Sequence, residues 1–291
     1  MPDPPLPRFC ELPDELSDPA TAAAAILPVP YDRTSTWKRG ADQGPRAILE
    51  ASHHIEWYDL ATGEETCRRS IATLEPVLCN DQPEVLADQL DPKVGTLIER
   101  GTIPVVLGGD HSVAIGAIRG AARVVPGLSV LQIDAHADTR DSYHGSRYNH
   151  ACVMARAREW CEIVQVGVRA VDAAEMPLLD PRRVVFAHQI CGAAPETGWM
   201  DRALAGLGDD VYVTIDLDGF DPAVVPATGT PEPGGLDWYQ VTGLLERVAA
   251  HRRVVGFDVV ELLPTPGQWA SEFLAAKLVY RFLSDILKTT P

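Results

Sequence analysis

Residues 128–138 read LSVLQIDAHAD, an apolar run that ends in acidic and histidine side chains. The same pattern recurs in IPVVLGGDH (103–111) and VYVTIDLD (211–218). The apolar parts consist mainly of Val, Ile and Leu, which is typical of parallel strands covered on both faces. Open parallel sheets build their sites where the carboxyl ends of the strands meet. These stretches therefore predict a parallel sheet with a polar site at that edge.

Apolar runs and helical stretches alternate along most of the remaining chain. Further strands are predicted at 24–30, 163–168, 184–187 and 254–260, and helices at 44–52, 83–100, 112–125, 149–161, 237–251 and 268–287. Asp237 is the expected N-cap of the helix that follows it. Alternation of this kind implies βαβ units, and so an α/β fold with a mostly parallel central sheet. Residues 1–22 lack such periodicity. We predict an N-terminal arm over 1–22 and a single domain over 23–291.

Composition limits the classes of function that this chain can have. The 291 residues include 25 Lys and Arg against 41 Asp and Glu, a formal charge of −16. Nucleic acid is an unsuitable partner because phosphate binding needs clustered basic residues, whereas a cationic substrate or divalent metals suit this charge. No run approaches the ~20 apolar residues of a membrane span. The acidic, Pro-rich N-terminus lacks the features of a signal peptide, and the six cysteines form no CxxC pair. We expect a cytoplasmic protein with reduced thiols.

Six potential metal ligands follow the three strands. In DAHAD they occupy positions i, i+2 and i+4, which an extended backbone places on one face. Buried acids without compensation are rare and costly, so a purely structural role does not explain the whole set. Four carboxylates and two imidazoles can hold two divalent cations, for which hydrolysis by an activated water is the expected chemistry. The ligand types admit Mn²⁺, Zn²⁺, Co²⁺ or Ni²⁺. The six are His111, Asp134, His136, Asp138, Asp216 and Asp218.

Two residues near these motifs have open roles. Asp110 either orients the His111 imidazole or caps the helix that starts at about residue 112. Arg169, in VGVR, is expected in a structural ion pair rather than in the site.

The motifs carry a family resemblance. GGDHS, DAHAD and TIDLDGFDPAVVPATGTPEPGG (214–235) resemble three signatures of the ureohydrolases, the arginase and agmatinase family. PYDRTSTWKRGADQGPRAILEAS (30–52) and GFDVVELLP (256–264) also resemble that family, so the likeness extends from about residue 24 to the C-terminus. It implies an arginase-like three-layer αβα sandwich, two Mn²⁺ per subunit and hydrolysis of a guanidino group to urea and an amine. It also implies a homo-oligomer, a trimer or hexamer.

Ligand roles are likewise implied by the resemblance. One manganese would be held by His111, Asp134, Asp138 and Asp216, and the other by Asp134, His136, Asp216 and Asp218. Asp134 and Asp216 would then bridge both ions, together with a hydroxide. Four carboxylates balance two dications, so the added hydroxide leaves the site net negative, which suits a guanidinium.

The resemblance also identifies residues for catalysis and substrate binding. His150, in RYNHACVM, resembles a proton-shuttling histidine, and its ordinary pKa suits that task; His144 is the local rival. Glu261 resembles the carboxylate that pairs with the guanidinium, and Thr230 resembles a threonine that supports it. Asp138 is grouped with His150 and Glu261 as catalytic.

Substrate choice depends on the loop TRDSYHGSRYN (139–149). This loop does not match the arginase loop that holds an α-amino acid, and it resembles agmatinases more. We predict hydrolysis of agmatine to putrescine and urea, with Asp141 as partner of the cationic tail. Arg140 and Arg147 could instead receive a carboxylate, as in 4-guanidinobutyrate or a related guanidino acid, with arginine ranked third. The intact ligand set disfavours a silent scaffold, and TGTPEPGG disfavours a binuclear phosphatase or amidase.

Overall fold

The central element is an eight-stranded sheet, seen in a computed structural model that describes residues 5–288. The strand order is β4-β1-β5-β10-β9-β6-β7-β8, and every neighbouring pair is parallel. The strands are β1 (Ala24–Val29), β4 (Ile71–Thr73), β5 (Ile103–Gly108), β6 (Ser129–Ile133), β7 (Glu162–Val168), β8 (Val184–Phe186), β9 (Asp210–Asp216) and β10 (Arg253–Val260).

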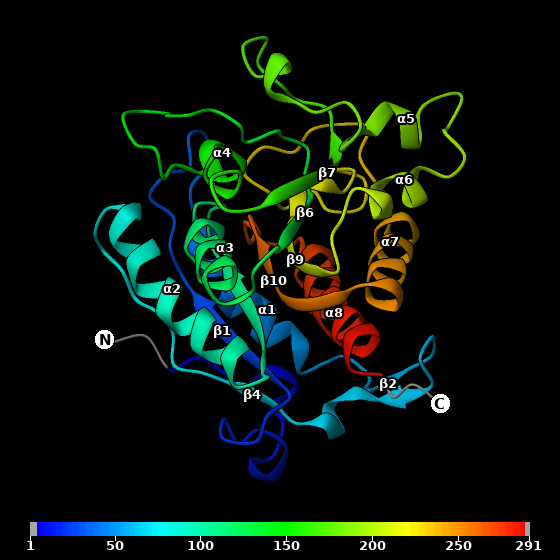
Figure 1. Cartoon of the computed structure of the whole chain (residues 1–291). Helices are drawn as coiled ribbons and strands as arrows, with labels where there is room; N and C mark the ends of the chain where they lie inside the picture. The colour runs from blue at the N-terminus through cyan, green and yellow to red at the C-terminus, as the bar shows by residue number, and fades with distance from the viewer. Residues whose placement is uncertain (1–4, 289–291) are drawn as a thin grey trace.

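Helices cover both faces of this sheet, as the runs of Val, Ile and Leu predict. One core joins inward residues of α1, α6, α7 and α8 to the sheet, and a second core joins residues of α2, α3 and α4 to its other face. Figure 1 shows α2, α3 and α4 on one side and α7 and α8 on the other. The three-layer αβα prediction is confirmed. The helices are α1 (Gly44–Ser52), α2 (Pro83–Glu99), α3 (Val113–Val124), α4 (Val153–Ala157), α5 (Ala187–Cys191), α6 (Trp199–Ala205), α7 (Trp238–His251) and α8 (Trp269–Leu287).

The strand order opens a crevice at the middle of the sheet. β5 and β6 follow each other in the chain, but β10 and β9 lie between them in the sheet. The loops after β5 and β6 therefore diverge, and a crevice forms at their carboxyl ends. The predicted ligands follow β5, β6 and β9, so three of these four central strands deliver them to the crevice.

The predicted secondary structure is correct for the longer elements and incomplete for the short ones. The Asp237 side chain accepts a hydrogen bond from the Gln240 amide, which confirms the predicted cap of α7. The helix predicted at 149–161 is shorter: residues 150–152 form a 3-10 turn, α4 follows, and a tight turn ends it after Ala157. The short β4, α5 and α6 were not predicted, nor was the hairpin β2 (Tyr58–Asp59) with β3 (Glu64–Glu65).

The described part of the predicted arm, residues 5–22, packs onto the body. It contains two 3-10 turns, Phe9–Glu11 and Asp14–Leu16, and its Phe9 and Leu12 side chains are buried in the larger core. Residues 1–4 lie outside the described residues. The division into an arm and one catalytic domain stays a prediction.

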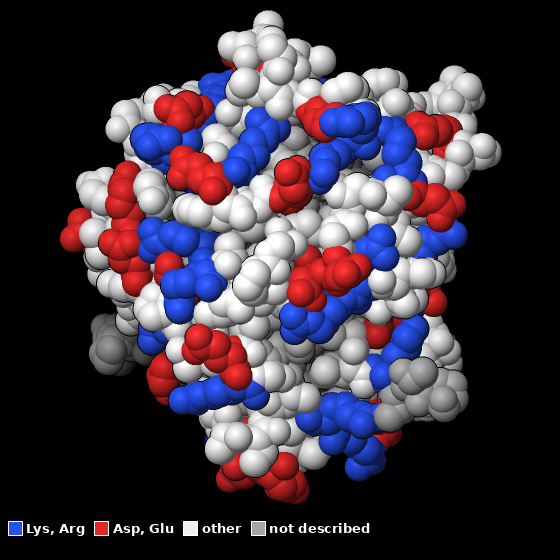
Figure 2. All heavy atoms as spheres, in the orientation of Figure 1, with Lys and Arg blue, Asp and Glu red and all other residues white. Residues whose placement is uncertain are grey.

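The surface carries charges of both signs. Figure 2 shows basic and acidic side chains next to one another on one face, with no extended area of either sign. Ion pairs between the two signs include Arg119 with Asp91 and Arg253 with Asp210. No helix within residues 5–288 has both the length and the apolar character needed to cross a bilayer.

Candidate metal centre

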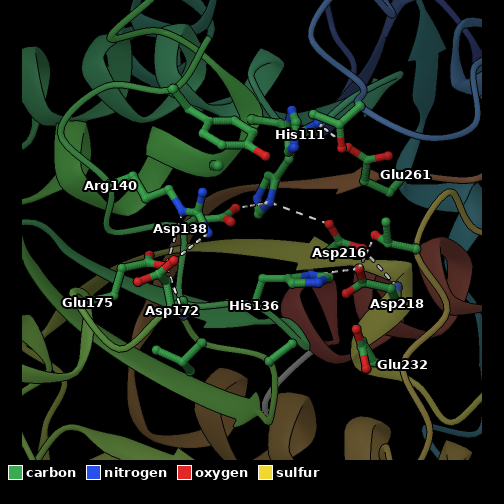
Figure 3. A pocket seen from close by; sticks show the side chains of 18 residues that line it. His111, His136, Asp138, Arg140, Asp172, Glu175, Asp216, Asp218, Glu232 and Glu261 are labelled. Carbon is green, nitrogen blue, oxygen red and sulfur yellow. Dashed lines mark hydrogen bonds and ion pairs between the residues drawn. The ribbon is translucent and has the colours of Figure 1, made fainter.

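Five of the six predicted ligands line one cavity of about 430 Å³, and the sixth, Asp134, lies beside them with its oxygens toward His111 and His136. They follow three strands of the crevice, and Figure 3 shows how five of them lie around this cavity. His111 lies in the turn between β5 and α3, Asp216 is the last residue of β9, and Asp218 lies in the 3-10 turn Leu217–Gly219. The other three follow β6. Two sets of three side chains each have one ligand atom apiece within 4.8 Å of one another; they are His111 with Asp134 and Asp216, and His136 with Asp134 and Asp218.

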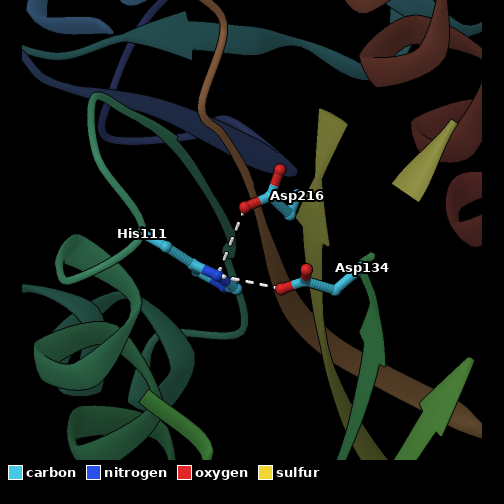
Figure 4. Close-up of side chains that lie close together, drawn as sticks. All are labelled: His111, Asp134 and Asp216. Atoms are coloured by element: carbon cyan, nitrogen blue, oxygen red, sulfur yellow. Dashed lines mark ion pairs between the residues drawn. The ribbon is translucent and has the colours of Figure 1, made fainter. Parts of the chain in front are cut away.

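The first set is centred on the Nδ1 atom of His111. This nitrogen lies 3.2 Å from Oδ2 of Asp134 and 3.5 Å from Oδ2 of Asp216, as Figure 4 shows. Oδ2 of Asp138 lies 3.0 Å from the same nitrogen. All four side chains are buried. One imidazole nitrogen thus faces three carboxylates.

The second set shares Asp134 with the first. Nδ1 of His136 lies 3.0 Å from Oδ2 of Asp218 and 3.6 Å from Oδ1 of Asp134. The two oxygens of Asp134 therefore face different imidazoles, Oδ2 toward His111 and Oδ1 toward His136. A carboxylate in this position can bridge two ions, as the family resemblance implied for Asp134.

The DAHAD motif is not an extended segment with its three ligands on one face, as the sequence predicted. β6 ends at Ile133, before the motif begins, and Asp138 has a φ of 52°. That left-handed conformation is uncommon for a residue other than glycine and marks a sharp turn. Asp138 thereby approaches His111, whereas His136 approaches Asp218. A turn, rather than one strand face, distributes the motif over the two sets.

The buried carboxylates require positive charge nearby. Burial, followed by the negative charges of Asp218 and Asp134, raises the pKa of Asp216 well above its usual range. Burial and then the charge of Asp134 raise the pKa of Asp138 to about 6. Divalent cations between the carboxylates would relieve both desolvation and repulsion. The donor set of carboxylates and imidazoles, without thiolate, fits two hard or borderline divalent ions.

Two residues that were not predicted from the sequence, Thr214 and Asp258, orient the His111 imidazole on the side away from the carboxylate ligands. Oγ1 of Thr214 donates to Oδ1 of Asp258 over 2.6 Å and lies 2.9 Å from Nε2 of His111. Because the hydroxyl proton is committed to Asp258, Thr214 accepts from Nε2–H. The lone pair of His111 is then on Nδ1, a buried atom without a hydrogen-bond partner among the described residues. A metal ion is the partner that such an atom suits. Thr214 lies two residues before Asp216 on β9, and this same-face spacing was the available signal.

Glu261 forms another part of the cavity wall. It also has a left-handed φ, 63°, and its amide donates to the carbonyl of Gly109. Its Oε1 accepts from the His111 amide over 2.7 Å, so the carboxylate is held beside the ligand set. Burial, followed by the charge of Asp110, raises the pKa of Glu261 well above its usual range. A guanidinium is the kind of cation that such a buried carboxylate can pair with.

Thr230 makes a contact other than the predicted one, whereas the contacts of Asp110 are close to one of its two predicted roles. Thr230 lines the cavity, but its hydroxyl lies 3.4 Å from Oδ2 of Asp218, and no hydrogen bond joins it to Glu261. Asp110 accepts hydrogen bonds from the amides of Arg33, Thr34 and Ser112. It thus connects the 33–34 segment to the start of α3, closer to the capping alternative than to orientation of His111.

His150 lines the cavity, whereas His144 is exposed and does not. Nδ1 of His150 lies 3.1 Å from Oγ1 of Thr34, which also accepts from the His150 amide. Burial lowers the pKa of His150, and the charge of Asp110 opposes this effect. A neutral imidazole is therefore positioned to exchange protons inside the cavity. Geometry favours His150 over its rival.

The outer part of the cavity is lined by charged and aromatic side chains, which we call the outer rim. Arg140 lies 3.3 Å from a carboxylate oxygen of Glu175 and 3.5 Å from one of Asp172, and its guanidinium stacks on Tyr143. Figure 3 shows Glu232 apart from this group, toward Asp218. The outer rim comprises Arg140, Tyr143, Asp172, Glu175 and Glu232.

Asp141, which was predicted to bind a cationic tail, lies outside the cavity lining, and so does Arg147, which was an alternative for a carboxylate tail. Asp141 is exposed and pairs with Arg156 at 2.6 Å and Arg147 at 3.0 Å. Arg147 also pairs with Glu159. Their charges are directed to one another on the surface rather than into the site.

Arg169 binds backbone rather than an acidic partner. Its guanidinium donates to the carbonyls of Gly167, Asp218, Gly219, Phe220 and Glu232. The predicted ion pair is replaced by this set of carbonyl contacts, which join the turn after β9 to the loop of Glu232.

Comparison with known proteins gives a consistent result. The model of the arginase family matches residues 22–284. The N(1)-aminopropylagmatine ureohydrolase of Synechocystis sp. is 36% identical over 275 residues, which cover 91% of this chain and 89% of that protein. The agmatinase of Pyrococcus horikoshii is 34% identical over 261 residues, covering 88% and 89%.

Solved structures agree with the fold. The agmatine ureohydrolase of Thermoplasma volcanium has a TM-score of 0.81 and 33% identity, covering 92% of this chain and 91% of that one. The proclavaminate amidino hydrolase of Streptomyces clavuligerus has a TM-score of 0.85 and 28% identity, with 98% of both chains covered. These chains share the architecture over nearly their full length.

Proposed function

The chain belongs to the arginase family, and we propose that it hydrolyses the guanidino group of agmatine, releasing urea and putrescine. The observation that carries this proposal is a cavity that combines two carboxylate-imidazole sets with a buried glutamate. The first feature suits activation of water, and the second suits a guanidinium.

Two Mn²⁺ ions are the proposed cofactor. His111, Asp134, Asp138 and Asp216 would hold one ion, and Asp134, His136 and Asp218 the other. Asp216 would also contribute to the second ion, as the family resemblance implies. When bound, such a pair lowers the pKa of water so that hydroxide is available near neutral pH. Restoration of activity to metal-depleted protein by Mn²⁺, compared with Zn²⁺, Co²⁺ and Ni²⁺, tests the identity of the metal.

Glu261 and His150 are the proposed catalytic side chains outside the ligand sets. Glu261 would hold the guanidinium, orienting its carbon toward the ligand side chains. His150 would accept a proton from the attacking water and deliver it to the departing nitrogen, which leaves as an amine. Its lowered pKa supports the neutral starting state that this transfer needs.

The outer rim supports an amine tail over a carboxylate tail. Arg140, the basic residue of the rim, already pairs with Glu175 and Asp172. A substrate carboxylate would have to compete with both acids for it. Amine-terminated guanidino compounds therefore rank above 4-guanidinobutyrate and arginine.

N1-aminopropylagmatine is a second candidate substrate. The relatives from Synechocystis sp. and Thermus thermophilus bear that activity in their names, at 36–38% identity. The cavity of about 430 Å³ lies in the ordinary range for small-molecule sites and can admit a tail longer than that of agmatine.

A panel of four compounds tests the proposal. Urea release is measured from agmatine, N1-aminopropylagmatine, 4-guanidinobutyrate and arginine with Mn²⁺ present. We expect the highest kcat/KM for one of the two amine-terminated compounds. Absence of urea from all four would refute guanidino hydrolysis, and a preference for 4-guanidinobutyrate would refute the choice of tail.

A further inference from the structure

We propose that Glu232 is the residue that selects the tail of the substrate, by binding an ammonium group four carbons from the guanidino nitrogen and repelling a carboxylate there. This inference rests on the proposed function. It concerns a residue that neither holds the metal nor contacts the guanidinium, so the two proposals can fail separately.

Glu232 has a free carboxylate in the cavity. Its side chain lines the cavity with His136, Asp218 and Thr230, and Figure 3 shows it on the same side as Asp218. Its backbone carbonyl is bonded to Arg169, but its carboxylate has no hydrogen bond or ion pair with any residue that the structure describes. The residue is half-buried. A half-buried carboxylate without a partner is available to a cationic ligand.

The other charged side chains of the outer rim are already paired with one another. Arg140 pairs with Glu175 and Asp172, and Glu175 also accepts from the amide and hydroxyl of Thr139. Within the described lining, Glu232 is therefore the charged rim residue whose side chain lacks a protein partner. An incoming ammonium gains most by pairing with it, since Glu175 and Asp172 already have a cationic partner in Arg140.

The backbone of Glu232 is held rigidly relative to the ligands. Pro231 and Pro233 restrict the backbone on either side of it. Arg169 donates to the Glu232 carbonyl at 2.8 Å and to the Asp218 carbonyl at 2.6 Å through the same nitrogen. Asp221 accepts from the amides that follow, at Gly234 and Gly235. The spacing between the metal ligands and this carboxylate is thus preset, which favours tails of one length.

The chemistry distinguishes the candidate substrates. Agmatine has a primary ammonium after four carbons, and N1-aminopropylagmatine has a secondary ammonium at the same position. Both can donate to Glu232 in a charge-assisted hydrogen bond. In 4-guanidinobutyrate a carboxylate occupies nearly the same distance and meets a like charge.

The test compares Glu232→Gln with the wild type on three compounds of similar length: agmatine, butylguanidine with its uncharged tail, and 4-guanidinobutyrate. Glutamine keeps the shape and removes the charge. We expect KM for agmatine to rise about tenfold with kcat nearly unchanged, because the lost contact is made equally in the ground and transition states. KM for butylguanidine should change by less than about twofold, and KM for 4-guanidinobutyrate should fall.

Two further variants test whether the effect depends on the charge of residue 232 and on its location in the cavity. Glu232→Asp keeps the charge on a shorter side chain and should restore part of the affinity for agmatine. Glu56→Gln removes the same charge from an exposed residue outside the cavity lining and should leave all three KM values unchanged. Folding and manganese content of each variant are checked by circular dichroism and elemental analysis.

The outcomes separate the two proposals. An equal rise in KM for agmatine and butylguanidine, or no rise for agmatine, would overturn the role of Glu232. Failure of the wild type to release urea from any of the three compounds would instead overturn the proposed function.

Discussion

The inner and outer ends of the cavity are built in different ways. At the inner end the ligand side chains follow β5, β6 and β9, and each is close in sequence to a buried strand. At the outer rim the contacts join loops, such as Arg140 with Glu175 over 35 residues and Arg169 with Glu232 over 63. The inner end therefore depends on the sheet, whereas the outer rim depends on pairings between loops.

This difference suggests a division of roles. Parallel strands hold the ligands within narrow limits, because sheet register and both cores fix the strand ends. Loop pairings can be exchanged without disturbing the sheet. We infer that the inner end determines whether the reaction occurs and the outer rim determines which tail is accepted. Variants at the two ends should accordingly affect kcat and KM differently.

The largest effect is expected for Asp134→Asn at the inner end. The change removes a charge that both ligand sets share, so both metal sites are weakened. We expect urea release to fall by at least about a thousandfold, since activation of water supplies several kcal/mol. Manganese content by elemental analysis should fall in parallel. Asp88→Asn, on an exposed acid of α2, is the matched control. Retention of two ions with full activity would contradict the assignment of ligands.

Glu261→Gln should separate substrate orientation from metal binding. Glutamine keeps an acceptor for the His111 amide, so the turn after β5 should be preserved. Loss of the charge that faces the guanidinium should lower kcat/KM for agmatine by about a hundredfold. Manganese content should stay at the wild-type level. A loss of metal equal to that in Asp134→Asn would place Glu261 in a structural role instead.

Thr214→Val tests whether the hydrogen bond between Thr214 and His111 is needed for metal binding. The change removes the acceptor for Nε2 of His111 and leaves Asp258 without its hydroxyl donor. We expect manganese affinity to fall by about 10- to 100-fold, as for other residues that orient a metal-binding histidine. Titration of metal-depleted protein measures this. Thr214→Ser, which keeps the hydroxyl, should restore most of the affinity. Equal affinities in all three proteins would mean that His111 needs no such support.

The same division explains what the sequence could predict. DAHAD and TIDLD identified five of the ligands because DAHAD follows β6 and TIDLD spans the end of β9, two strands whose burial is evident from Val, Ile and Leu. The left-handed turn at Asp138 was not predicted, because no glycine marks it. Asp141 was predicted to bind the cationic tail because it is an acid in the loop at 139–149, which resembles that of agmatinases. Pairing of Asp141 with Arg156 and the approach of Glu232 depend on tertiary contacts that no local pattern contains.

The smallest effect is expected for Asp141→Asn. This variant directly compares Asp141 and Glu232 as the residue that binds the tail of the substrate. The carboxylate is exposed, lies outside the cavity lining and pairs with Arg147 and Arg156. The Arg147 pair is exposed and contributes little, and the buried Arg156 keeps Glu159 as a partner, so KM for agmatine should change by less than about twofold. Steady-state urea release at matched ionic strength measures this beside Glu232→Gln. If KM rises in Asp141→Asn as much as we expect for Glu232→Gln, the loop at 139–149 carries the tail, and the cavity assignment of Glu232 is wrong. If KM rises only in Glu232→Gln, tail recognition belongs to the loop after β9, which Arg169 joins to the turn of Asp218.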